Sequence, residues 1–461
     1  MKKISPIIWK IAYDLSFIVA AVQILLGLCW AVVNLDAVPM FAETKLLLEV
    51  SETWLLDEYI GAGYVALIWL AKVFNRVLGI PYQVWIYLLQ FGISCFVAYR
   101  LLSSIVALQM RSVKRINLLF AALFVNTIPF LLQGHFAVLP YSLSGSAYLL
   151  LFSFLLDMVR KVRDKKSAIE KKTLFPNIVA VLLCWLFGAL LIPKYLWLSG
   201  MLVCLCFIYV GLLQQTTKGM LTIVIVMGVL LGGVSLLLTT EEGARGRVSD
   251  SLESQAMRRF AWSYLERMES VWPWDIVVEF SEEELKYSAV SPERTMEIFG
   301  PRVERLYGKE TAELYFSEMA KAVLVYNTKE AIREISADMV FYLCPQGASM
   351  YHLQGRGASY TGQSYGKMQE NGGEIASLLL EWSGLAFVLQ GLMGALQLMR
   401  TRAWEGWLWI AGVGVFSQAL CWTWLTAGAI SYLVCPVNMV LWGALLTTWL
   451  WADRKIGAEA V

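Results

Sequence analysis

The sequence has few charged residues and almost no histidine. Only 16% of its 461 residues are charged, 58% are hydrophobic, and the histidines are two, His135 and His352. Two histidines exclude a histidine-rich metal centre, and so little charge over this length excludes an ordinary water-soluble protein. The net charge of +2 gives no support for nucleic-acid binding. The composition therefore indicates a polytopic membrane protein that contacts the lipid bilayer.

Recognisable cofactor and nucleophile motifs are also missing. All of the eight cysteines except Cys344 lie in hydrophobic segments, which gives neither a disulfide framework nor a zinc-binding spacing. The chain contains no P-loop, no GxSxG motif, no HExxH motif and no dinucleotide-binding fingerprint. No cofactor is therefore predicted, and no metal ligand is assigned.

The hydrophobic segments predict an all-α polytopic membrane protein with about ten transmembrane helices. Short connections rich in Lys and Arg, such as the one with Arg111, Lys114 and Arg115, are expected in the cytoplasm. The resulting alternation places both termini in the cytoplasm, and it requires that the apolar run at 59–78 does not cross the membrane. If this run crosses, the chain has eleven spans. The predicted spans begin near Ile11, Tyr82, Ile116, Ser142, Leu174, Leu196, Met220, Ile375, Trp407 and Ile430.

Three regions follow from this pattern. Residues 1–240 form an N-terminal membrane domain, with interfacial helices in a first outer loop at 34–80. Residues 241–374 have soluble composition with an acidic excess and predict a mostly helical extracytoplasmic domain. Within it, the Gly-, Ser- and Tyr-rich stretch 346–374 is either a linker or a loop that closes over a substrate. Residues 375–461 return to the membrane.

The first outer loop carries the most informative pattern. Residues 41–56 predict a helix on which Glu43 falls in line with Leu47, Val50 and Trp54, so its carboxylate faces the apolar side. A carboxylate in that setting is costly and usually needs a reason, which is either a function or the favourable interaction of a negative charge with the start of the helix. The following run is predicted to lie in the membrane interface, with Lys72 and Arg76 reaching the headgroups. The solvated face of the 41–56 helix consists of Lys45, Glu49 and Glu52.

Ionisable and aromatic residues predicted on the outer side suit a lipid-phosphate substrate. A carboxylate can deprotonate an attacking hydroxyl, a cation can stabilise a departing phosphate, and aromatic faces can pack on a sugar or prenyl chain. Convergence of two of the carboxylates would favour a divalent ion. The acidic candidates are Glu43, Asp57, Glu58 and Asp338, the cations are Lys194, Arg258 and Arg259, and the aromatics include Trp272 and Trp274.

Several short motifs together resemble a known family. They are Leu78-Gly79-Ile80-Pro81-Tyr82 leading into a span that ends at 98–102, the stretch 135–146, Pro193-Lys194-Tyr195, and Trp272-Pro273-Trp274. Their order resembles glycosyltransferases of the C-type fold, nearest to bacterial relatives of the family 39 protein mannosyltransferases and lipid A aminoarabinose transferases. The likeness runs from Ile11 to about Pro345. It departs at Glu43, where those enzymes have Asp, and at Tyr64-Val65, where Tyr-Pro is common.

The resemblance implies a hexosyl or pentosyl transferase in a bacterial plasma membrane. Such enzymes use a polyprenyl-phosphate sugar as donor and invert the anomeric centre in one displacement at the outer leaflet. Either Glu43 or Asp57 would be the base, or the chain would be an inactive member. Lys194, with Arg258 or Arg259, would hold the leaving phosphate, and no metal is implied. The residues expected to bind substrate are Tyr64, His135, Tyr195, Trp272 and Trp274.

Two other classes of function remain. A non-enzymatic transporter or flippase would need ionisable groups near the membrane midplane, where the sequence offers mainly Asp14 and Glu381, both near span ends. A scaffold for cell-surface polymer assembly would leave Glu43 without a role. The sugar, the acceptor (polysaccharide, lipid or protein) and the oligomeric state are not determined by the sequence.

Overall fold

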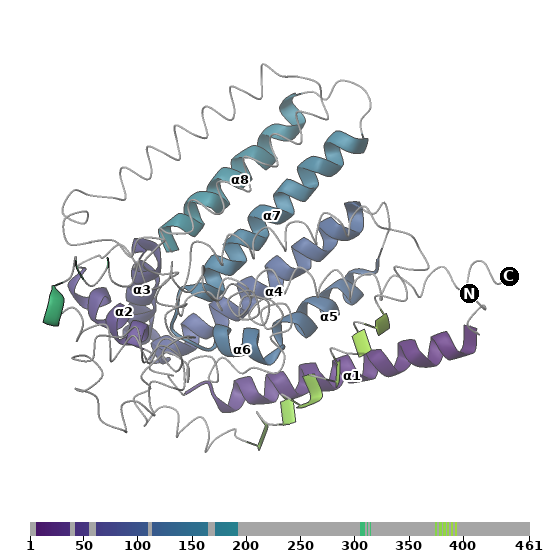
Figure 1. The fold of residues 1–461 in the computed structure, drawn as a ribbon, viewed down its shortest axis with the longest axis horizontal. Coiled ribbons are helices and arrows are strands. Elements are labelled where there is room, and N and C mark those ends of the chain that lie inside the picture. The colour runs from purple at the N-terminus through teal and green to yellow at the C-terminus, as the bar shows by residue number, and fades with distance from the viewer. Residues whose placement is uncertain are drawn as a thin grey trace.

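The computed structural model describes residues 6–36, 42–54, 61–108, 113–164 and 171–191, with short stretches within 305–314 and 374–393. These residues form helices and no strand, so the all-α class is confirmed for the part that the structure describes (Figure 1). Most of 241–461 lies outside them. The helices are α1 (Pro6–Val33), α2 (Ala42–Thr53), α3 (Ala62–Leu78), α4 (Tyr82–Leu108), α5 (Arg115–Asn126), α6 (Pro129–His135), α7 (Tyr141–Asp164) and α8 (Lys171–Leu191).

Three of these helices are long and apolar enough to cross a membrane. The qualifying segments are Asp14–Val33, Tyr82–Ala107 and Ser142–Lys161, in α1, α4 and α7. At about 1.5 Å per residue, twenty residues cover the roughly 30 Å of a bilayer's hydrocarbon core. They match three of the predicted spans. The total of ten stays a prediction, because most of the other spans lie outside the described residues.

The span predicted near Ile116 is wrong in length. α5 begins at Arg115 and ends at Asn126 after 12 residues, or about 18 Å. The cause is Pro129, because proline lacks the amide hydrogen that continues a helix and fits best in a first turn. Pro129 begins the short helix α6, so this apolar run forms two helices with a break between them.

α1 ends and α4 begins at the same end of the bundle. The ring of Trp30, in the last turn of α1, lies edge-on to Phe136 with centroids 5.9 Å apart. Tyr87, in the second turn of α4, packs against the same Phe136 ring at 5.3 Å. Figure 1 places α2 and α3 at this end as well. This arrangement agrees with the prediction that the run at 59–78, between the first two spans, does not cross the membrane.

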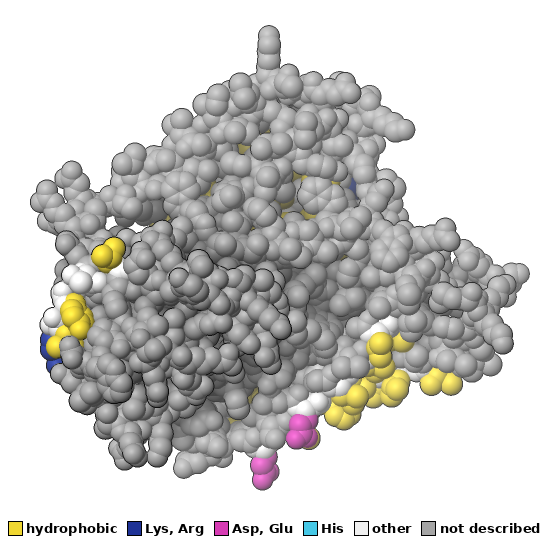
Figure 2. Space-filling model, viewed as in Figure 1, with side chains coloured by type: hydrophobic (Ala, Val, Ile, Leu, Met, Phe, Trp, Pro, Cys, Tyr) yellow, Lys and Arg dark blue, Asp and Glu magenta, His cyan; other side chains and the backbone are white. Residues whose placement is uncertain are grey.

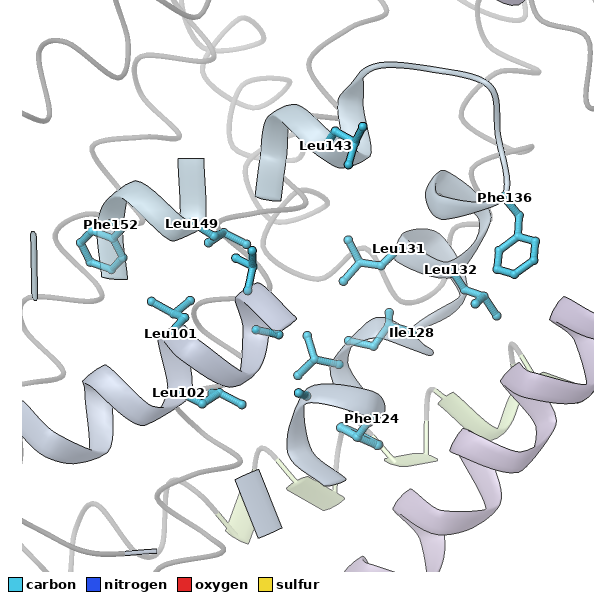
Figure 3. Packing of buried hydrophobic residues seen from close by; sticks show 14 of the residues in the cluster. Leu101, Leu102, Phe124, Ile128, Leu131, Leu132, Phe136, Leu143, Leu149 and Phe152 are labelled. Carbon is cyan, nitrogen blue, oxygen red and sulfur yellow. The ribbon is translucent and has the colours of Figure 1, made fainter. Parts of the chain in front are cut away.

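The hydrophobic core lies among α4, α5, α6 and α7. Figure 3 shows leucine, isoleucine and phenylalanine side chains of these helices and of their connections gathered in a common interior. α4 and α7 form the most extensive helix pair, and the hydroxyls of Ser104 and Ser153 join them at 2.9 Å. Small side chains let two helices approach closely, and their hydroxyls pair where water is excluded. Packing and local hydrogen bonds therefore hold this pair together.

An ion pair also joins α4 and α7 inside their apolar segments. The Arg100 guanidinium donates to Asp157 Oδ2, and its Cζ lies 5.5 Å from the centre of the Phe154 ring. The Asp157 side chain is 7% exposed and that of Arg100 is 35% exposed. A charge in an apolar setting is tolerated mainly when it is paired. The pair therefore helps to determine which faces of α4 and α7 meet.

We expect Asp157→Leu to lower the free energy of unfolding by roughly 3 kcal/mol, because Arg100 keeps its charge and loses its partner. The double variant Arg100→Met, Asp157→Leu should recover most of this loss, because neither charge remains. Unfolding of the purified proteins in one detergent measures both effects. Equal losses in the single and double variants would contradict a pairwise interaction.

α3 crosses the bundle end from α8 to α4. At the start of α3, a Cβ on Gly61 would overlap the carbonyl oxygen of Leu190, near the end of α8. Near its other end, Phe74 packs against Trp85 in the first turn of α4, with ring centroids 5.7 Å apart. The outer face of α3 exposes apolar side chains. This is the surface expected of a helix in the membrane interface. They include Trp69, Leu70, Phe74, Val77 and Leu78.

The contact of Gly61 with α8 gives a matched test. Gly61→Ala should lower the free energy of unfolding by about 1–3 kcal/mol, because the added methyl group overlaps backbone atoms of Leu190 and Leu191. Gly92→Ala is the control, because a Cβ there meets no atom within 4 Å. Thermal unfolding in detergent should separate the two variants. Equal stability would show that α3 and α8 do not approach in this way.

Helical residues within 374–393 pack beside α1. The indole N–H of Trp382 donates to the carbonyl of Val19, and the side-chain amide of Gln390 donates to the carbonyl of Ser16, each at 2.9 Å. From Trp382 to Gln390 the residue number rises, whereas that of the partner in α1 falls from 19 to 16. The two segments are therefore antiparallel. Figure 2 shows a row of hydrophobic side chains along this edge, as expected for helices that face lipid.

Candidate functional site

The helix predicted at 41–56 is confirmed with shorter bounds, as α2. Leu47 and Val50 are buried and Glu49 is exposed, as the pattern predicts. Trp54 was expected on the buried face, and this is wrong, because the helix ends at Thr53 and Trp54 turns away with φ 57° and 46% exposure. Glu43 belongs to the first turn of α2, and its side chain lies outside the described residues.

Polar contacts attach α2 to its neighbours at both ends. At its start, the buried hydroxyl of Thr44 donates to the carbonyl of Val138 at 3.3 Å. Near its end, Lys72 of α3 donates to Ser51 Oγ and to Glu52 Oε1, each at 2.9 Å. This bond and the Lys72 charge lower the pKa of Glu52. Lys72, predicted to reach the headgroups, therefore pairs with α2 instead, whereas Arg76 is exposed.

Tyr64 and His135, both predicted to bind substrate, meet at one side chain of α4. The amide nitrogen of Gln90 donates to the carbonyls of His135 and Ala137, each at 2.8 Å, and its oxygen accepts from the Tyr64 hydroxyl at 3.4 Å. Tyr64, Gln90 and Ala137 have no exposed surface, and His135 is 3% exposed. Gln90 therefore ties α3 to the segment between α6 and α7. Whether Tyr64 and His135 also bind substrate stays a prediction.

The hydrogen bonds of His135 determine which ring nitrogen carries the proton. The side-chain amide N–H of Asn126 donates to the carbonyl of Ala122 at 2.8 Å. The side-chain oxygen of Asn126 is therefore the atom that faces His135 Nε2, at 2.9 Å. Nε2 must therefore donate. Nδ1 is then the acceptor, and it lies 2.7 Å from the hydroxyl of Ser142. The imidazole is the neutral Nε2–H tautomer.

The chain of donors continues into α4 and α7. Ser142 donates to His135, and Ser146 donates to the carbonyl of Ser142 at 2.9 Å. The Ser146 hydroxyl oxygen is then free to accept from Ser94 of α4, at 2.7 Å. Each hydroxyl proton in this chain has a defined acceptor. The result is a neutral network, directed from α4 through α7 and α6 to α5, which we call the His135 network (Ser94, Asn126, His135, Ser142 and Ser146).

Ser142, His135 and Asn126 have the connectivity of a nucleophile, a base and an orienting group. The burial of His135 opposes its use as a general base. Burial lowers the pKa of His135 to about 3, so the ring is a weak base that stays neutral at physiological pH. A general base works best with a pKa near the working pH. The network is therefore suited to holding α4, α5, α6 and α7 in register rather than to proton transfer.

The other predicted site residues are not brought together by the described part of the chain. No group of three His, Cys, Asp or Glu side chains that could hold a metal ion occurs within it. The predicted residues that lie outside the described ranges are Asp57, Lys194, Tyr195, Arg258, Arg259, Trp272 and Trp274, together with Glu58 and Asp338.

Sequence reasoning missed Gln90, Ser94 and the Arg100–Asp157 pair. A signal for the first two was present, because they are polar residues four positions apart in an apolar span and so share a helix face. Ser142 and Ser146 repeat this spacing in α7. Pairing of the two faces required knowledge that α4 and α7 are neighbours.

Comparisons with known proteins add no relative to this picture. The chain matches no protein-family model, no curated protein and no solved structure. Any functional assignment therefore depends on the residues and geometry described above.

The buried neutral His135 predicts a dependence of stability on pH. The unfolded-state pKa is about 6.5 and the folded-state pKa is about 3, so between these values the unfolded chain binds more protons. The contribution of neutral His135 to the free energy of unfolding is fully present above pH 6.5. It falls as the pH decreases, by roughly 2 kcal/mol from pH 7 to pH 5. Unfolding in detergent across this range should show the loss in wild type and a smaller one in His135→Gln. Parallel pH profiles would exclude His135 as the source.

Proposed function

We propose that the chain is a membrane glycosyltransferase that moves a hexosyl or pentosyl group from a polyprenyl-phosphate donor to an outward-facing acceptor. The bundle end with α2 and α3 would lie at the outer face of a bacterial plasma membrane, with both termini in the cytoplasm. Supporting this orientation, Arg115 begins α5 and Lys161 lies near the end of α7, and both helix ends are opposite to α2 and α3 (Figure 1).

The observation that carries the proposal is the placement of α2. This helix bears Glu43 in its first turn, buries one face and is fixed at both ends across an apolar bundle end. A carboxylate on such a helix would lie at the membrane interface, where it could accept a proton from a hydroxyl that attacks a lipid-linked sugar. Asp57, which follows α2 in the chain, is the alternative base.

The remaining roles in the proposal come from the sequence. Lys194, with Arg258 or Arg259, would neutralise the leaving polyprenyl phosphate, and Tyr195, Trp272 and Trp274 would pack on the sugar or the prenyl chain. Inversion requires one displacement, in which the acceptor oxygen bonds to the anomeric carbon as the phosphate oxygen leaves. The base receives the hydroxyl proton. Acceptor classes remain polysaccharide, lipid and protein.

A transporter or flippase is the second candidate, because polar groups occur inside the apolar segments. Gln23 lies at the centre of Asp14–Val33 with 1% exposure, and its amide has no partner among the described residues. Arg100 and Asp157 are charged within their segments. These two are paired with each other, however, and the predicted carriers Asp14 and Glu381 are exposed. The transferase is therefore preferred.

Binding of undecaprenyl phosphate to the protein in nanodiscs tests the proposal. Lys194→Ala should weaken saturable binding by about tenfold, the loss of one charge-assisted hydrogen bond, and Glu43→Gln should leave it unchanged. Glu43→Gln should instead abolish release of undecaprenyl phosphate from a panel of its hexosyl and pentosyl esters. Binding no greater than that of an unrelated membrane protein would overturn the transferase and favour the transporter or a scaffold.

A further inference from the structure

We propose that Thr44 is a positioning residue that fixes the orientation of α2, and with it Glu43, against the buried segment between α6 and α7. This inference deepens the proposed transferase and depends on it for its functional meaning. Its structural part, the attachment of α2 through one hydroxyl, stands on the geometry alone.

The acceptor of the Thr44 hydroxyl is a carbonyl in a buried segment with many contacts. The segment from Phe136 to Pro140 is buried although it lies outside the helices α6 and α7, and Figure 3 shows the chain passing from Phe136 to α7. Gln90 holds the carbonyls at 135 and 137, and Phe136 packs between Trp30 and Tyr87. The carbonyl of Val138, which follows, therefore belongs to a rigid part of the bundle.

Thr44 is the residue next to Glu43, in the first turn of the same helix. Its side chain has no exposed surface, and its donation to Val138 at 3.3 Å joins positions 94 apart in the chain. A helix is a rigid element, so one polar contact in its first turn limits its rotation about its axis. Neighbouring residues of a helix differ by about 100° in direction, so fixing position 44 fixes the direction of position 43.

The second attachment of α2 is different in kind. The Glu52 side chain is 73% exposed, so its pair with Lys72 is open to water and weakened by salt. The Thr44 contact is buried and uncharged, and salt does not screen it. Lys72 also donates to the hydroxyl of the buried Ser51, so only the Glu52 part of this attachment is fully open to salt. Of the two attachments, Thr44 is the one nearer to Glu43 and the one that involves no charged group.

The test measures the reactivity of a cysteine at position 43. The rate of labelling of Glu43→Cys by a water-soluble maleimide is measured in nanodiscs, with the native cysteines giving the background. Adding Thr44→Val, which keeps the shape and removes the hydroxyl, should change the rate by about threefold or more, because thiol reactivity follows exposure. Thr44→Ser should restore it. Thr53→Val is the matched control, because among the described residues that exposed hydroxyl bonds the Glu49 carbonyl of its own helix.

Rates within twofold in all four proteins would overturn the positioning role. If Thr44→Val does not yield folded protein, the double variant Thr44→Cys, Glu43→Gln is used instead. The measurement is then the rate of amide hydrogen exchange in α2. Faster exchange than in Glu43→Gln alone supports the attachment, and equal exchange contradicts it. In the transfer assay, Thr44→Val should lower kcat without changing KM, and Thr44→Ser should recover kcat. If Glu43→Gln remains fully active while the labelling rates change, the assignment of the base fails and the positioning of α2 stands.

Discussion

The buried, non-helical backbone between α6 and α7 imposes the main constraint on this bundle. The carbonyls of Ala137 and Val138 in this segment accept hydrogen bonds from side chains, and in a membrane protein water does not reach such a site to replace those donors. Gln90 and Thr44 meet this requirement from α4 and α2. The need for donors at one short segment therefore explains why helices from distant parts of the chain converge on the same end of the bundle.

The two ends of the bundle are held by different kinds of polar contact. At the end that carries α2 and α3, the buried contacts are uncharged, and the only described ion pair there is the exposed one between Glu52 and Lys72. Toward the opposite end, Arg100 and Asp157 carry charge inside the helix pair. Neutral contacts tolerate burial without a counter-charge, whereas the charged pair must stay closed.

Sequence reasoning predicted what depends on local composition. The apolar spans in α1, α4 and α7, the helix at α2 and its buried face all follow from hydrophobicity and helical period. It failed where one residue interrupts a periodic run, as Pro129 does after α5, or where a helix ends before its pattern does, as at Trp54. Contacts between helices, such as Gln90 with Tyr64, were not predictable, because a single sequence does not say which helices are neighbours.

The neutrality of the His135 network has an electrical consequence. An energised membrane acts on charge with a free energy of about 2.3 kcal/mol per elementary charge per 100 mV. The network connects α4, α5, α6 and α7 through serine, asparagine and uncharged imidazole groups, so a voltage across the bilayer does no net work on it. The geometry of the His135 network is therefore independent of whether the cell is energised, and only strong acid, by charging His135, would couple the network to the field.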